Sequence, residues 1–247
     1  MMNVGKPLVY ILFLIGAPFK LQGAEYFINL PEPIESTSAN KKIIDFFNSV
    51  YAEVDIQPIY IYSPAKRGFT NLHRKKIQAE GYRAGYIGET NVGVEYRIDV
   101  PLARVKVGVF CIYKYRCTIQ RGQNYAIQAS FQQGQEICRA LDIKCQFVKG
   151  DRALAKLLER NMVDAVISPF PAYESYLCRT KQKTLFYKAL PAHSFTIHHY
   201  TNLKSAALRQ KITQAIVGRL RLPISPFRDF SSEPNLERCA KLVKSAG

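Results

Sequence analysis

Strand-like and helix-like segments alternate along this sequence, and their order constrains the fold more than any other feature. Apolar residues recur with helical spacing in the segment 40–54. A second helix is expected over 68–80, which is followed by Gly81, a residue type that often ends a helix. Three strand-like runs surround these segments, at 24–30, 56–62 and 83–89. This β-α-β-α-β order predicts a mostly parallel sheet with helices on its faces.

A second alternating unit follows the long strand-like run Val105–Tyr115. Ser130 and Gln133 have the spacing of a capping box, which predicts that a helix begins there. Asp151 is expected to cap a further helix, and Asn161 to end it in a left-handed conformation. Strands are expected at 124–130, 143–148, 163–168 and 194–200, with helices at 203–220 and Glu233–Lys244. The sequence therefore predicts two similar α/β units.

The stretch Leu157–Phe170 joins a helix end to a buried strand, with one acid, Asp164, between them. One face of the expected strand carries Val163, Ala165 and Ile167. The corresponding position in the first unit, three residues after Gly81, is Ala84, so the turn itself does not require an acid. We therefore expect Asp164 to be structural and to accept hydrogen bonds near the start of the strand.

The first residues resemble a secretory signal. Lys6 is followed by the apolar run Leu8–Ala17 and then by the small residues Gly23 and Ala24. The apolar run is too short to span a bilayer comfortably, and a buried strand or an uncleaved anchor is the alternative. We expect residues 1–24 to be a cleavable signal peptide and the mature protein to be periplasmic.

Export would place the six cysteines in an oxidising compartment, and all six lie after the expected signal. Cys138 and Cys145 flank a helix end and the strand after it, which makes them candidates for a local disulfide. Cys111 with Cys117 is a second candidate, and free buried thiols are the alternative. No CxxC or HxxxH spacing occurs, so no zinc site is predicted.

The chain carries a formal net charge of +16. Its basic residues are scattered rather than gathered in a stripe, so binding to nucleic acid is not predicted. The charge is explained either by solvated faces or by an acidic ligand or an anionic envelope surface. His198 and His199 are neighbours in an extended run and should point to opposite faces, which argues against a shared metal site. No cofactor is predicted.

Three segments resemble the bacterial extracellular solute-binding proteins of the amino-acid-binding type (family 3). LLERNMVDAVI is similar to the helix, turn and Asp-Ala strand of the family's second lobe. EGYRAGYIGE followed by VEYRIDVPLARVKVGVF is similar to the end of the first lobe and its approach to the hinge. FYKALPAHSFTIHHYTNLKSAALRQKITQAI is similar to the return crossover and the helix after it.

The resemblance implies a two-lobed, type II periplasmic-binding-protein-like α/β fold. Lobe 1 would comprise 25–109 plus 193–247 and lobe 2 would comprise 110–192, with crossovers near Val109 and His193 forming the hinge. A ligand would bind between the lobes at the carboxyl ends of the strands. Hinge closure would then bury the ligand.

Amino-acid binders of this family hold the ligand carboxylate with a lobe 1 arginine, whose fork suits that geometry. Here the corresponding place reads Glu89-Thr90-Asn91, and the later Arg97 is the candidate clamp, with an exposed strand position as its alternative. Ser130 and Phe131 are candidates because a helix start favours anions. The full set of candidate ligand-binding residues is Asn29, Ser63, Glu89, Thr90, Arg97, Ser130, Phe131 and Ser168. For each of them, a loop residue without ligand contact is the alternative.

The predicted function is the capture of a small polar or acidic, amino-acid-like solute by a monomeric periplasmic protein without catalysis. Its partner would be an inner-membrane permease of the ABC type or a membrane sensor. The missing arginine and the high positive charge support a second interpretation, a degenerate binding fold for signalling or protein interaction. A dehydratase-like enzyme is the third, since Glu89 is the only carboxylate expected at the cleft edge.

Overall fold

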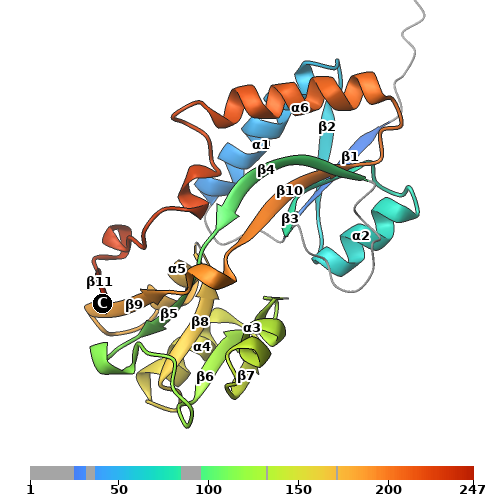
Figure 1. The fold of residues 1–247 in the computed structure, drawn as a ribbon. Coiled ribbons are helices and arrows are strands. Elements are labelled where there is room, and N and C mark those ends of the chain that lie inside the picture. Colours follow the sequence, from blue (N-terminus) through green and yellow to red (C-terminus); the bar gives the residue numbers. More distant parts are fainter. Residues whose placement is uncertain (1–24, 32–36, 85–95, 132, 171) are drawn as a thin grey trace, which may run out of the picture.

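The computed structural model describes residues 25–31, 37–84, 96–131, 133–170 and 172–247. The expected signal peptide and the candidate residues Glu89 and Thr90 lie outside these ranges. Two sheets form the centres of two lobes, which lie one above the other in Figure 1. None of the helices in these ranges combines the length and hydropathy that a membrane crossing requires.

The first sheet has five strands in the order β2-β1-β3-β10-β4. β1 pairs in parallel with β2 and β3, whereas β10 runs antiparallel to β3 and β4. The strands are β1 (Tyr26–Leu30), β2 (Pro58–Tyr62), β3 (Ala79–Ala84), β4 (Arg97–Val105) and β10 (Phe195–Thr201). The parallel order predicted for the first three strands is confirmed, and the chain returns from the second lobe to complete the sheet in the opposite direction.

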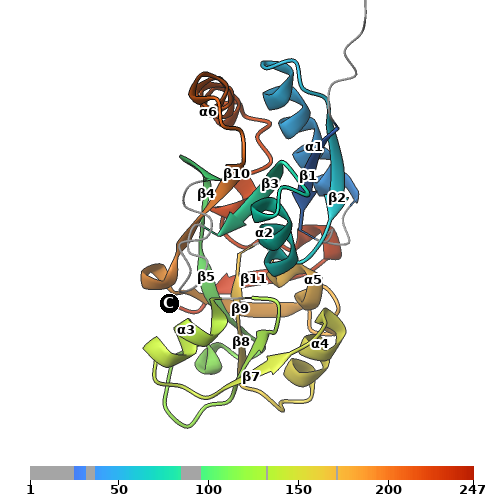
Figure 2. The ribbon, with the colours of Figure 1, turned by 90° about the vertical axis from the view of Figure 1, so that its right-hand side faces the viewer.

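Helices cover both faces of this sheet (Figures 1 and 2). α1 (Thr37–Ala52) and α6 (Ala206–Leu220) pack beside each other on one face, and α2 (Ala65–His73) lies on the other. The helical spacing of apolar residues predicted from the sequence explains the packing of α1. Its buried side chains include Ile43, Phe47, Val50 and Tyr51.

The second helix ends earlier than the sequence predicted. α2 stops at His73 rather than at residue 80, because Lys75 adopts a left-handed conformation with φ of 56° and the chain turns into β3. Gly81, expected to stop the helix, instead lies inside β3. A Cβ atom on Gly81 would stand 2.3 Å from Leu30 Cδ2, so glycine is needed there for close packing against β1.

The second sheet has six strands in the order β11-β9-β5-β8-β6-β7. β6 pairs in parallel with β7 and β8, β5 runs antiparallel to β8 and β9, and β11 is parallel to β9. The strands are β5 (Val107–Cys111), β6 (Tyr125–Gln128), β7 (Cys145–Val148), β8 (Ala165–Pro169), β9 (Thr184–Ala189) and β11 (Leu242–Ser245). The second lobe thus also has a mixed sheet.

The helices of the second lobe also lie on both faces of their sheet. α4 (Asp151–Glu159) and α5 (Tyr173–Leu177) pack on one face, and α3 (Gly134–Ala140) on the other. The predicted capping box at Ser130 is wrong, because successive turns carry the chain past it and α3 begins only at Gly134. The predicted cap at Asp151 is also wrong, since its carboxylate accepts a hydrogen bond from Gln128 Nε2 at 3.0 Å.

The turn before β8 forms as the sequence predicted. Asn161 adopts the left-handed conformation, with φ of 53°, directly after α4. The Asp164 carboxylate accepts a hydrogen bond from the Asn124 backbone N–H at 2.8 Å and lies 3.4 Å from Arg116 Nη1. Asp164 therefore joins the start of β8 to the segment before β6, and its predicted structural role is confirmed.

All six cysteines are paired in the structure. Two disulfides, Cys111–Cys117 and Cys138–Cys145, are the local bridges that the sequence indicated. The third, Cys178–Cys239, joins positions 61 residues apart. It could not be predicted, because nothing in the sequence shows that the C-terminal tail returns to α5.

Within the described ranges, the chain passes three times between the two sheets. β4 ends in the first sheet at Val105 and β5 begins in the second at Val107, so the first crossing is at Lys106 rather than near Val109. The second crossing covers 190–194 and contains the short helix η3 (Pro191–His193). The third lies in the C-terminal tail, which was not expected to cross.

The C-terminal tail connects the first lobe to the second. Phe230, at the end of η4 (Arg228–Phe230), packs against the core of the first lobe, whereas Leu236 is buried in that of the second. The helix predicted at Glu233–Lys244 is replaced by the short helix η5 (Glu237–Cys239) and by β11. The placement of all of 193–247 in lobe 1 therefore does not hold for its last strand, because β11 pairs with β9. The other domain boundaries stay a prediction.

Polar contacts hold this tail against the second lobe and the first crossing. Glu233 Oε1 lies 2.7 Å from Lys106 Nζ, and the Asn235 backbone N–H donates to Tyr173 Oη at 2.9 Å. Lys241 Nζ donates to the Gln182 carbonyl at 2.7 Å. The tail is thus fixed at several points in addition to the Cys178–Cys239 disulfide.

A chain of buried polar side chains crosses the core of the first lobe. His199 Nδ1 lies 3.0 Å from the Gly81 carbonyl, which can only accept, so Nδ1 carries the proton. His199 Nε2 then accepts from Tyr51 Oη at 2.7 Å, and Tyr51 Oη lies 3.0 Å from Tyr26 Oη. His198 bonds elsewhere, to the Ile98 carbonyl at 3.0 Å. Within the described ranges, no cluster of His, Cys, Asp and Glu could hold a metal ion.

Candidate functional site

Four polar residues gather at the carboxyl edge of β1 and β2. Asn29 lies near the end of β1, and Ser63 directly follows β2. In β3, Glu80 is the register partner of Asn29 on β1, and Arg83 follows three residues later along the strand. In Figures 1 and 2, α2, which follows this edge, lies at the end of the first lobe nearest the second. Topology predicted Asn29 and Ser63 here, whereas Glu80 and Arg83 were missed.

Hydrogen bonds join these four residues into one network. Asn29 Nδ2 donates to Glu80 Oε1 at 2.8 Å, and Ser63 Oγ donates to Asn29 Oδ1 at 2.9 Å. Arg83 Nε donates to Glu80 Oε2 at 2.7 Å, and Arg83 Nη2 donates to the Ser63 carbonyl at 3.0 Å. Each side chain is therefore held in one orientation by at least one of the others.

A β-bulge brings Glu80 and Arg83 to the same face of β3. In a regular strand, residues three apart point to opposite faces. On β10 only His199 lies between the partners of Glu80 and Arg83, whereas two residues, Gly81 and Tyr82, lie between them on β3. The extra residue turns Arg83 toward Glu80, as bulges commonly re-aim a side chain.

The ion pair is enclosed by the fold. The Glu80 residue is fully buried and Arg83 is 8% exposed. Gly68 of α2 lies directly over the pair, since a Cβ atom there would stand 1.7 Å from Glu80 Oε1 and 2.4 Å from Asn29 Nδ2. Burial raises the pKa of Glu80 to about 7, while the Arg83 charge and the Asn29 amide oppose that rise. Glycine at position 68 therefore lets α2 cover a carboxylate and the amide that supports it.

The charges in one short segment of the sequence point to this pair. Glu80 and Arg83 are charged residues in a short segment, AEGYRA, that is otherwise small or apolar. If such a segment becomes a buried strand, its charges must be paired. Reading residues 68–80 as one helix hid this, because it left Glu80 on a solvated helix end.

The other candidate residues have separate surroundings. Arg97 lies on β4 and pairs with Asp99 at 3.3 Å, and Ser168 is buried and donates to the Pro169 carbonyl at 3.2 Å. Phe131 packs near Phe195, with ring centroids 6.0 Å apart. Ser130 is exposed.

None of these four candidates joins the network of Asn29 through a hydrogen bond among the described residues. Ser130 and Phe131 precede α3 instead of beginning it. The helix N-terminus that made them candidates for anion binding is therefore elsewhere. Their ligand contacts, and those of Arg97 and Ser168, stay predictions.

We expect His199 to make the first lobe sensitive to acid. Burial lowers its pKa to about 4, from an ordinary value of 6.5. Between pH 4 and pH 6.5 the unfolded chain binds a proton at His199 more tightly than the folded protein does. The stability that His199 contributes is therefore complete above about pH 6.5 and is lost as the pH falls toward 4. Glu80 acts in the opposite sense, because its raised pKa favours the folded protein as the pH falls from 7 to 4.5.

Urea unfolding of the wild type and of His199→Gln at two pH values isolates the histidine, since the Glu80 contribution is common to both proteins. Between pH 7 and about pH 4.5, we expect the wild type to lose about 2 kcal/mol more of its free energy of unfolding than the variant. Equal losses in the two proteins would show that His199 does not titrate in this way.

No family model matches the sequence, and no curated protein matches it in sequence. Solved structures match most of the chain. The GluR0 ligand-binding core in complex with L-glutamate has a TM-score of 0.61 at 10% identity, covering 81% of this chain and 93% of that chain. The BvgS VFT2 domain of Bordetella pertussis has a TM-score of 0.62 at 12% identity, covering 82% and 93%.

A third match is AbpA of Streptococcus pneumoniae, an amino acid ABC transporter substrate-binding protein bound to L-arginine. Its TM-score is 0.56 at 11% identity, covering 85% of this chain and 97% of that chain. Together these likenesses define the class of structure: the chain has the two-lobed fold of type II periplasmic-binding-protein-like domains, as predicted. The resemblance to family 3 solute-binding proteins is confirmed at the level of the fold.

Proposed function

We propose that this protein binds a small polar solute between its two lobes, at the edge formed by Asn29, Ser63, Glu80 and Arg83. The Glu80–Arg83 ion pair is the observation that carries this proposal. Desolvation of two charges largely offsets their attraction, so a buried ion pair is weak evidence of a stabilising role. Open α/β sheets bind ligands at the carboxyl ends of their strands. A role in positioning a ligand would explain a buried ion pair at that place.

Arg83 supports a ligand that carries a carboxylate. Its bonds to Glu80 and to the Ser63 carbonyl use two of the five N–H donors of a guanidinium. Because these bonds hold the guanidinium in place, Arg83 can present its other donors to a ligand oxygen with little loss of side-chain freedom. We propose that Arg83, from β3, supplies the contact that the family takes from an arginine at the place of Glu89-Thr90-Asn91.

The ligands of the structural neighbours support an amino-acid-like solute. GluR0 is in complex with L-glutamate and AbpA is bound to L-arginine. On this proposal the protein works without catalysis and as a monomer. Residues 1–24 direct it to the periplasm, where it delivers its solute to a permease or reports it to a membrane sensor.

Thermal-shift screening of the purified chain with amino acids, polyamines and small carboxylates tests the proposal. A ligand present at about 100 times its dissociation constant stabilises the folded protein by about 2.7 kcal/mol, which raises Tm measurably. We expect at least one carboxylate-bearing solute to do so. Arg83→Lys should abolish that shift, and Arg121→Lys, at an exposed arginine paired with Asp142 in the second lobe, is the control that should keep it. The absence of any shift on folded protein would refute solute binding.

A further inference from the structure

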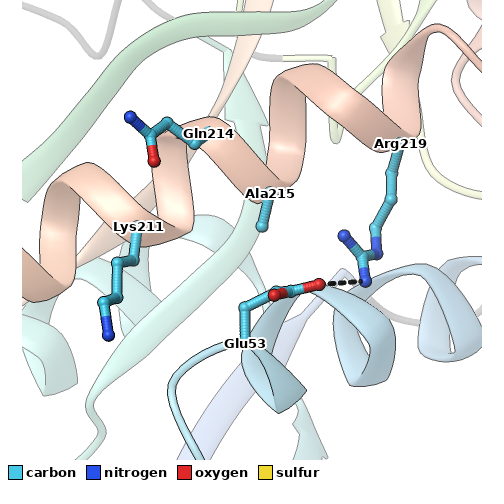
Figure 3. A pocket seen from close by; sticks show the side chains of 5 residues that line it. All are labelled: Glu53, Lys211, Gln214, Ala215 and Arg219. Carbon is cyan, nitrogen blue, oxygen red and sulfur yellow. Dashed lines mark hydrogen bonds and ion pairs between the residues drawn. The ribbon is translucent and has the colours of Figure 1, made fainter.

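The end of the first lobe farthest from the second lobe carries a hollow between α1 and α6. Its volume is about 390 Å³, and it is lined by Glu53, Lys211, Gln214, Ala215 and Arg219. Figure 3 shows Lys211 and Arg219 reaching toward α1 on either side of Ala215. Arg219 Nη2 lies 2.9 Å from Glu53 Oε1, so this acid is already matched by one of the two cations.

Two exposed aliphatic side chains, Leu222 and Ile224, follow the end of α6. Lys211, Ala215 and Leu222 share one side of the helix by their spacing, and the Leu222 backbone N–H donates to the Arg219 carbonyl at 3.2 Å, which extends the helical turn. Leu222 is 46% exposed and Ile224 is 80% exposed. Single exposed aliphatic residues are common on proteins, but here two lie two positions apart in a segment whose charged residues are all basic.

The segment that contains α6 carries only positive side-chain charge. Between positions 204 and 228 the sequence contains no Asp or Glu, and its basic residues are Lys204, Arg209, Lys211, Arg219, Arg221 and Arg228. Arg209 is occupied inside the lobe, where its guanidinium donates to the backbone carbonyls of Thr201 and Arg97. Lys204, Lys211, Arg221 and Arg228 are exposed. A partner for this surface therefore needs negative charge and must also accept aliphatic side chains.

We propose that this surface, defined as Lys211, Arg221, Leu222 and Ile224, binds an anionic phospholipid bilayer. Leu222 and Ile224 would enter the headgroup region while the cations pair with lipid phosphates. Aliphatic residues flanked by Lys and Arg are the composition of segments that lie at a membrane surface. Protein interfaces, in contrast, favour tyrosine and tryptophan at their centres. The chain's net charge of +16 adds long-range attraction.

The position of this surface is compatible with solute binding. Figures 1 and 2 both place α6 at the end of the molecule away from the second lobe. A protein held to a bilayer by α6 would therefore keep its second lobe, and the edge formed by Asn29, Ser63, Glu80 and Arg83, away from the lipid. Membrane binding does not depend on the proposed solute, so the two proposals can fail separately.

Flotation with lipid vesicles tests the proposal. We expect the protein to float with vesicles of phosphatidylglycerol mixed with phosphatidylcholine and not with phosphatidylcholine alone. Lys211→Gln and Arg221→Gln should each weaken the partition coefficient about fivefold, the contribution of one cation near an anionic surface. Leu222→Ser combined with Ile224→Ser should weaken it about tenfold or more, by removing two buried aliphatic side chains.

Matched controls lie in the second lobe, where Lys114 is exposed and Tyr115 is 69% exposed. Lys114→Gln and Tyr115→Ser should leave vesicle binding unchanged, and circular dichroism confirms that every variant is folded. Equal weakening by all variants would overturn the proposal in favour of attraction by net charge alone. Failure to float with anionic vesicles would also overturn it, even if glycerol phosphate bound in the hollow.

Discussion

Replacing both cysteines of the third disulfide, by Cys178→Ser with Cys239→Ser, is expected to lower the free energy of unfolding by about 4 kcal/mol. The bridge closes a loop with a sequence separation of 61 residues, and a long loop removes much conformational freedom from the unfolded chain. It is also the only covalent bond between the described C-terminal tail and α5. Urea unfolding under oxidising conditions measures the loss.

The Cys138–Cys145 disulfide supplies a matched control, because its sequence separation is only 7 residues. Cys138→Ser with Cys145→Ser should cost about 2 kcal/mol in the same measurement. If the two double variants lost equal stability, loop closure would not be the dominant contribution of the longer bridge.

The same variant is expected to loosen the two lobes. The tail is a third connection between the sheets. Without its disulfide it loses one of its attachments and keeps the β11–β9 pairing, the burial of Leu236 and the polar contacts of Glu233, Asn235 and Lys241. Small-angle scattering should therefore give a larger radius of gyration for the Cys178→Ser, Cys239→Ser variant. The Cys138→Ser, Cys145→Ser control should keep the wild-type value, because neither of its cysteines lies in the tail that connects the two sheets.

Removing the arginine of the buried ion pair is the second change with a large expected effect. Arg83→Met leaves the Glu80 carboxylate buried without its cation, and breaking a buried pair in this way typically costs about 3–5 kcal/mol. We expect this loss near pH 8. It should shrink as the pH falls toward 7, because the Arg83 charge that lowers the pKa of Glu80 in the wild type is gone, and the buried carboxyl of the variant takes up a proton at a higher pH.

Two further variants separate the effect of the unpaired charge from the effect of lost side-chain packing. Glu80→Gln combined with Arg83→Met removes both charges and should recover most of the lost stability, since neutral replacements of buried ion pairs are often well tolerated. Arg97→Met breaks only the partly exposed contact with Asp99 and should cost less than about 1 kcal/mol. If the double variant stayed as unstable as Arg83→Met alone, the destabilisation would come from lost packing and not from an unpaired charge.

Several features of this protein followed from the sequence by itself because they depend on neighbouring residues. The helical spacing of Phe47, Val50 and Tyr51 defined the buried face of α1. Asn161 ended a helix, and the closely spaced cysteine pairs formed local disulfides. Each of these outcomes is decided within a few residues of chain, where propensity and spacing act directly.

Other local expectations failed where packing opposed them. Gly81 was expected to end a helix but lies in β3, where it packs closely against Leu30 of β1 and Phe47 of α1. The capping box at Ser130 did not form, since the chain continues through turns before α3. In both places the sequence pattern was present, and contacts with distant segments decided the outcome.

The candidate site was only half visible in the sequence. The ends of β1 and β2 indicated Asn29 and Ser63, but bringing Arg83 toward Glu80 required a bulge in β3 against β10. The return of β11 to the second sheet likewise required the partner strand β9. Only the tertiary structure decided these features, because strand pairing joins segments that the sequence separates by more than fifty residues.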